Sequence, residues 1–161
     1  MLLLYKFIGA ACRETTFPLL TSIQNIRDMK HESIVVVYDS CQAIAEEIAD
    51  KLGAETVSVQ SMNVRQIENS QSLVLIIEFQ DGGKLSPHWQ YVYLLLSEVD
   101  LSGKNIAVIV AQGNKRDCGT ITKELCDRLM NQGAHIIGDQ LYSGTSGQNL
   151  DNWICAISPN L

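Results

Sequence analysis

Four residues stand between a predicted strand and a predicted helix, at a position where the first helix turn could bind an anion. Asp39, Ser40, Cys41 and Gln42 follow the apolar run Ile34–Tyr38 and precede the amphipathic segment 43–52. Free N–H groups at a helix N-terminus attract phosphate. A phosphate ~4 Å from Asp39 would, however, be repelled by about 4 kcal/mol per charge pair at an effective dielectric constant near 20. The residues therefore indicate either a weak anion site or a helix N-cap formed by Asp39 and Ser40.

Two further predicted loops carry the other candidate binding residues. Residues 78–86 follow the strand Leu73–Ile77, and residues 112–120 follow the strand Ile106–Ala111. Glycine in such loops lets the backbone approach a flat ligand or make a tight turn. Because ligands of parallel sheets bind beyond the carboxyl ends of the strands, we expect the three loops to form one site. The candidates in the second and third loops are Phe79, Gln80, Asp81, Gly82, Gly83, Gln112, Gly113, Asn114 and Cys118.

Nucleophilic and metal-binding side chains form no recognisable catalytic pattern. The five cysteines contain no CxxC pair, so we expect reduced thiols and a cytoplasmic protein. Cys41 lies near a helix N-terminus, which favours a thiolate and makes a redox pair with Cys118 conceivable. No metal site or catalytic triad emerges from His31, His88 or His135. The sequence favours an electron carrier or a binding module over a catalyst.

The elements that must position these loops alternate along the chain. Short apolar runs without period-two alternation predict five strands at 34–38, 56–59, 73–77, 106–111 and 134–137. Helices are expected at 43–52, from Pro87 to before Asp100, from about Ile121 to Gly133, and at 150–157, with one or two weak turns within 60–70. This order predicts an α/β doubly wound, five-stranded parallel sheet with helices on both faces.

Composition limits the partners of this domain. The 161 residues have 46 % apolar content, 19 % charged content and a net charge of −6. These values are ordinary for one globular domain and exclude disorder as its main state. The negative charge argues against nucleic acid and anionic membranes as partners, because both would repel the chain.

The first 28 residues form a separate region. The apolar run Met1–Cys12 is too short to span a bilayer, and its charge pattern does not match a signal peptide. We interpret residues 1–28 as an N-terminal extension, either an accessory arm or a consequence of a natural start at Met29. Residues 29–161 form the predicted domain.

From Met29 to the C-terminus the chain resembles a short-chain flavodoxin. The resemblance is carried by a G-D-G-E-L-like turn at 82–85, a D-L-x-G-K turn at 100–104, a Gly113–Asn114 loop, a G-A-x-x-x-G segment at 133–138, and Trp89 and Trp153. It implies the strand order 2-1-3-4-5, FMN bound at the three loops, and single-electron transfer to a redox partner protein.

Two departures from the flavodoxin pattern bear on FMN. The loop Asp39–Gln42 is shorter by about four residues than the family's T/S-x-T-G-x-T phosphate loop, whose N–H groups surround the phosphate. Cys118 stands where the family places a tyrosine against the flavin, and Phe79 is the nearby aromatic for the other face. Two functions therefore stay open: an FMN-dependent electron carrier, or an FMN-free binding or regulatory module with an unknown protein partner.

Overall fold

The structure is a computed structural model that describes residues 33–161 except 113–114 and 143–146. The predicted extension 1–28 and the candidates Gly113 and Asn114 lie outside the described residues. The main sheet has the order β2-β1-β3-β5-β6, and its strands are parallel. These five strands are β1 (Ile34–Tyr38), β2 (Glu55–Ser58), β3 (Ser72–Gln80), β5 (Asn105–Gln112) and β6 (His135–Ile136). The predicted doubly wound sheet and its strand order are confirmed.

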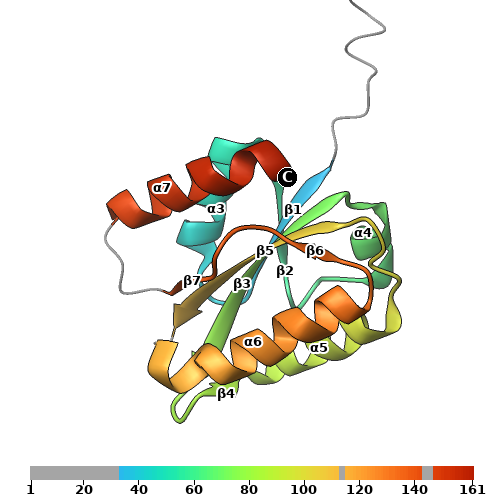
Figure 1. The fold of residues 1–161 in the computed structure, drawn as a ribbon, viewed down its shortest axis with the longest axis vertical. Coiled ribbons are helices and arrows are strands. Elements are labelled where there is room, and N and C mark those ends of the chain that lie inside the picture. The colour runs from blue at the N-terminus through green and yellow to red at the C-terminus, as the bar shows by residue number, and fades with distance from the viewer. Residues whose placement is uncertain (1–32, 113–114, 143–146) are drawn as a thin grey trace, which may run out of the picture. The chain divides into compact units, whose positions relative to one another are not determined.

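Helices cover both faces of this sheet (Figure 1). Successive side chains of a strand point to opposite faces, so each central strand contributes to two cores. Val74 and Ile76 of β3 pack on the side of α3 (Gln42–Leu52) and α7 (Gly147–Ile157). Leu73 and Leu75 pack on the other side, with α4 (Val64–Asn69), α5 (Pro87–Glu98) and α6 (Lys115–Asn131).

Local sequence signals fix several helix ends. Gly53 ends α3 in the left-handed region, with φ of 64°, as its place after the periodic residues predicts. Asn63 and Gln66 form a reciprocal capping box at the start of α4. Ser86 caps α5 and Pro87 occupies its first turn, which confirms the helix start expected at this proline.

Three elements differ from the sequence-based expectation. β3 continues to Gln80, where it pairs antiparallel with the short β4 (Lys84–Leu85). α6 begins at Lys115, inside the segment expected to be a loop. β7 (Leu141–Tyr142) pairs with β5, although these residues are not among the five predicted strands. A two-residue strand depends on its partner rather than on its own sequence, so no local pattern reveals it.

None of the helices among the described residues is both long enough and apolar enough to span a membrane.

Candidate functional site

The centre of the candidate site is the start of α3, where a buried carboxylate takes the place expected for an anion. Glu78 Oε1 accepts hydrogen bonds from the backbone N–H groups of Ser40, at 2.7 Å, and of Cys41, at 2.9 Å. Glu78 Oε2 accepts a third from the Ser40 hydroxyl at 2.6 Å. Glu78 is only 4 % exposed. Its carboxylate therefore satisfies the donors that a bound phosphate would need.

The alternation of side chains along β3 places Glu78 on the face of the sheet that carries α3, the face to which Val74 and Ile76 also point. The pairing of β3 with β5 shifts register just after Ile77, where Glu78 pairs with Gln112 and Ala111 is the extra residue of β5. Sequence reasoning missed Glu78 as a site residue, because it counted this carboxylate as the first residue of an exposed loop.

The predicted N-cap role of Asp39 and Ser40 is wrong. Cys41 is the N-cap residue of α3 and makes no side-chain capping bond. The Ser40 hydroxyl donates its hydrogen bond to the Glu78 carboxylate instead. The donors before the helix are satisfied from β3, a distant part of the chain, so no local capping residue is needed.

The Cys41 thiol is not activated by its place at the helix N-terminus. Burial, together with the negative charge of Glu78 and a hydrogen bond to it, raises the pKa of Cys41 from 9.0 to about 11. The expectation of a thiolate here is therefore wrong. Since only thiolates are strong nucleophiles and metal ligands, Cys41 is a protonated, half-buried packing residue at neutral pH.

Asp39 connects the first loop to the start of α5. Its Oδ2 accepts a hydrogen bond from the Ser86 hydroxyl at 3.0 Å, and its Oδ1 lies 3.1 Å from His88 Nδ1. The Asp39 side chain is only 10 % exposed, whereas that of His88 is 54 % exposed. The two contacts hold Asp39 in the interior and leave the far side of the imidazole ring open to solvent.

The second loop folds back on the protein. Gly82 and Gly83 have φ of 80° and 73°, which explains why glycine stands at both positions of this tight turn. A Cβ atom at Gly83 would lie 2.8 Å from the carbonyl oxygen of Asp117 in α6. The turn therefore packs directly on the first turns of α6. Gln80, Asp81 and Gly82 are exposed at the tip.

The aromatic and thiol candidates for flavin stacking are in the core. Phe79 is 5 % exposed and Cys118 is 1 % exposed, and both belong to the cluster beneath α5 and α6. Cys118 lies within α6 rather than in a loop, because the helix begins three residues earlier. Gln112 ends β5.

A hollow of about 520 Å³ joins the first two loops. Among the predicted residues, Asp39, Ser40, Phe79 and Gln80 line it. Sequence reasoning missed its five other residues, which are Gln60, Glu78, Ser86, Pro87 and His88. The Ser86–Pro87 helix start after the second loop was the one signal that could have placed Ser86 and His88 here. Among the described residues, those that line the hollow include two carboxylates and no lysine or arginine, so the hollow is unsuited to a dianion.

FMN does not fit these residues as they are arranged. The N–H groups of Ser40 and Cys41, which precede α3, already donate to Glu78, and Asp39 adds a second negative charge. The flavin ring would have to lie between the second loop and α6. There the close approach of Gly83 to the Asp117 carbonyl packs the second loop against α6. Both the phosphate and the ring would require rearrangement of the loops. Within the described residues, no group of three or more histidine, cysteine or acidic side chains could hold a metal ion.

Comparison with solved structures assigns the class of fold. Oxidised flavodoxin 2 from Bacillus cereus matches with a TM-score of 0.69 and 18 % identity, over 80 % of this chain and 99 % of that one. Oxidised flavodoxin 1 from the same organism matches with a TM-score of 0.66 and 18 % identity, over 80 % and 99 %. The chain therefore has the flavodoxin fold.

A third match is a flavodoxin with its cofactor. The Fusobacterium nucleatum flavodoxin bound to flavin mononucleotide matches with a TM-score of 0.57 and 20 % identity, over 79 % of this chain and 93 % of that one. No protein-family model matches this chain, and no curated protein matches it in sequence. The likeness is thus one of fold.

Proposed function

We propose that this chain is a cytoplasmic binding module with the flavodoxin fold and that it functions without bound FMN. The observation that carries the proposal is the Glu78 carboxylate just before α3, which accepts hydrogen bonds from the backbone N–H groups of Ser40 and Cys41. In this interpretation an internal anion replaces the cofactor phosphate. The fold is kept as a scaffold, and its partner is a protein.

The energetics of displacement support this function. A phosphate could bind here only after Glu78 gave up its three hydrogen bonds, each worth about 1.5–3 kcal/mol when one partner is charged. The phosphate would then face Asp39, which costs about 4 kcal/mol per charge pair at ~4 Å and an effective dielectric constant near 20. Since every 1.4 kcal/mol is about tenfold in affinity, these costs remove several orders of magnitude.

An FMN-dependent electron carrier with a redox partner protein is the second candidate. It is favoured by the likeness to flavodoxins, one of which is bound to flavin mononucleotide. In that case Glu78 and the turn at Gly83 must both move before the cofactor binds. The geometry of the site supports the FMN-free function better.

Absorption spectroscopy and a flavin titration separate the two functions. The purified chain is expected to be colourless and to release no flavin on heating. Added FMN should keep its full fluorescence in the presence of the protein, whereas the apo form of an FMN-binding flavodoxin, measured as a control, should quench it. A yellow preparation, or saturable quenching of FMN fluorescence by this chain, would show that it is a flavin carrier.

A further inference from the structure

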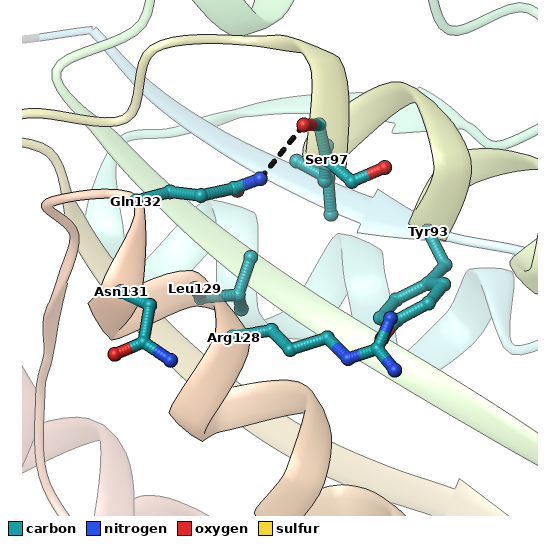
Figure 2. Close-up of a pocket in the computed structure, with 7 residues that line it drawn as sticks. Tyr93, Ser97, Arg128, Leu129, Asn131 and Gln132 are labelled. Carbon is teal, nitrogen blue, oxygen red and sulfur yellow. Dashed lines mark hydrogen bonds between the residues drawn. The ribbon is translucent and has the colours of Figure 1, made fainter.

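A second hollow, of about 270 Å³, lies between α5 and the end of α6 (Figure 2). Arg128, which lines it, comes eleven residues after Asp117, the residue of α6 that Gly83 approaches. Eleven residues are about 16 Å along a helix. None of the residues that line this hollow also lines the hollow at the first two loops, so the two are separate places on the molecule.

The base of this second hollow is apolar. Leu96 of α5 and Leu129 of α6 line it, and both side chains are buried in the core. An apolar cavity of ~150 Å³ can take up a benzene ring. The second hollow therefore has room for a small apolar group next to the two leucines.

Two contacts between α5 and the α6 end hold the polar side chains of the second hollow in place. Gln132 Nε2 donates a hydrogen bond to the Ser97 carbonyl oxygen at 2.8 Å. The Arg128 guanidinium lies 5.2 Å from the centre of the Tyr93 ring, which is within the range of a cation–π contact, and Figure 2 shows the two side chains together. Side chains that are fixed in advance lose less conformational entropy when a ligand binds.

Arg128 is the one charged residue among the described residues that line the second hollow. Apart from the contact with Tyr93, its side chain forms no ion pair and no hydrogen bond within the part of the chain that the structure describes. A guanidinium carries five N–H donors in a planar fork that matches the two oxygens of a carboxylate. The hollow therefore combines an apolar base with one fixed positive charge whose donors are unused.

We propose that the second hollow binds a small organic acid with one carboxylate and an apolar body. The carboxylate accepts hydrogen bonds from the Arg128 guanidinium, and the apolar body packs on Leu96 and Leu129. One cation, with no lysine or second arginine beside it among the described lining residues, suits a monoanion better than a dianion. This binding site does not depend on the function proposed above, because it shares no residue with the site around Glu78.

A purely structural role for Arg128 makes a different prediction. Arg128 lies in the last turn of α6, where a positive charge interacts favourably with the helix dipole. That interaction needs only a charge, which a lysine also supplies. A planar pair of N–H donors to a carboxylate needs the guanidinium, so the substitution Arg128→Lys separates the two roles.

Titration of the ¹⁵N-labelled full chain with sodium benzoate at constant ionic strength tests the proposal. In ¹H–¹⁵N correlation spectra, benzoate should give saturable shifts of the amide resonances of Leu129 and Gln132. The dissociation constant should be millimolar, because so small a ligand makes few contacts. Benzamide has the same ring without the charge, so it should bind about tenfold more weakly or less tightly still.

Variants of Arg128 complete the test. Arg128→Gln should weaken benzoate binding by about tenfold or more, and Arg128→Lys should weaken it by about threefold or more without changing the melting temperature. Arg116→Gln is the matched control, since Arg116 is an exposed arginine at the other end of α6, and it should bind benzoate like the wild type. The proposal is overturned by a wild-type chain without saturable shifts, by benzamide that binds as tightly as benzoate, or by either Arg128 variant with the wild-type dissociation constant.

Discussion

Glu78 binds Ser40 by two hydrogen bonds, one of 2.7 Å to its backbone N–H and one of 2.6 Å to its hydroxyl. The two residues are 38 positions apart, at the ends of adjacent parallel strands. This contact ties the first loop to β3 and satisfies donors that would otherwise be free. It is also the feature that distinguishes this site from one built to receive a phosphate.

Removing the Glu78 carboxylate should destabilise the fold. Glu78→Ala leaves partly buried N–H groups without an acceptor, so we expect a loss of about 2–4 kcal/mol in the free energy of unfolding. Glu78→Gln keeps an acceptor but loses the charge, so the free energy of unfolding should fall by about 1 kcal/mol. Urea denaturation followed by circular dichroism measures both values.

The exposed residue Glu124 of α6 supplies the matched control for this series. Glu124→Ala should change the free energy of unfolding by no more than about 0.5 kcal/mol, as is usual for surface substitutions. A Glu78→Ala variant as stable as wild type would mean that the carboxylate is not needed at the start of α3.

Cys41 should react slowly with alkylating reagents at neutral pH. With a pKa of about 11 rather than 9.0, it has about a hundredfold less thiolate than an unperturbed cysteine at any pH below 9. Its alkylation rate should therefore keep rising with pH up to about 11. The exposed Cys155 is the internal control, and mass spectrometry of the modified peptides resolves the two rates.

Glu78→Gln should move the Cys41 profile to lower pH, because the charge of Glu78 is one cause of the raised pKa after burial. The upward direction of the Cys41 pKa shift also makes the stability of the fold depend on pH. Since the pKa is higher in the folded chain than in the unfolded chain, the thiol favours folding below pH ~9, and this contribution is lost as the pH rises to ~11. A Cys41 that reacts as fast as Cys155 at neutral pH would contradict this account.

Two buried serines, Ser70 at the C-cap of α4 and Ser72 at the start of β3, should respond oppositely to truncation. The Ser72 hydroxyl is fully buried and makes no hydrogen bond with a described residue, so Ser72→Ala should leave stability unchanged or raise it by up to about 1 kcal/mol. Ser70 donates a hydrogen bond of 2.8 Å to the Ile67 carbonyl, so Ser70→Ala should cost about 1 kcal/mol. Thermal unfolding of both variants tests this prediction. A larger loss of stability for Ser72→Ala than for Ser70→Ala would contradict it.

The fold could be predicted from the sequence because its signals are local and agree with one another. The run Ile34–Tyr38 is the observed β1, and the four-residue spacing of Ile44, Ile48 and Leu52 predicts α3. Gly53 and Pro87 mark helix ends by their own backbone preferences. Each of these signals is contained within a few residues.

The site was harder to predict because its key contacts join distant residues. The role of Glu78 depends on the continuation of β3 to Gln80 and on the position of Ser40 in another strand–helix junction. The burial of Cys118 depends on α6 beginning at Lys115, in a polar stretch without a periodic apolar signal. The sequence shows that the first loop is short. It does not show that the Glu78 carboxylate lies where this loop would otherwise bind a phosphate.

The central claim is that the Glu78 carboxylate, and no cofactor phosphate, occupies the start of α3. The backbone amides of Ser40 and Cys41 report on this directly in ¹H–¹⁵N correlation spectra of the labelled chain. On titration with FMN to about 1 mM, a concentration that detects binding as weak as about −4 kcal/mol, we predict that neither amide resonance moves. Saturable shifts of both resonances, with loss of their hydrogen bonds to Glu78, would contradict the account.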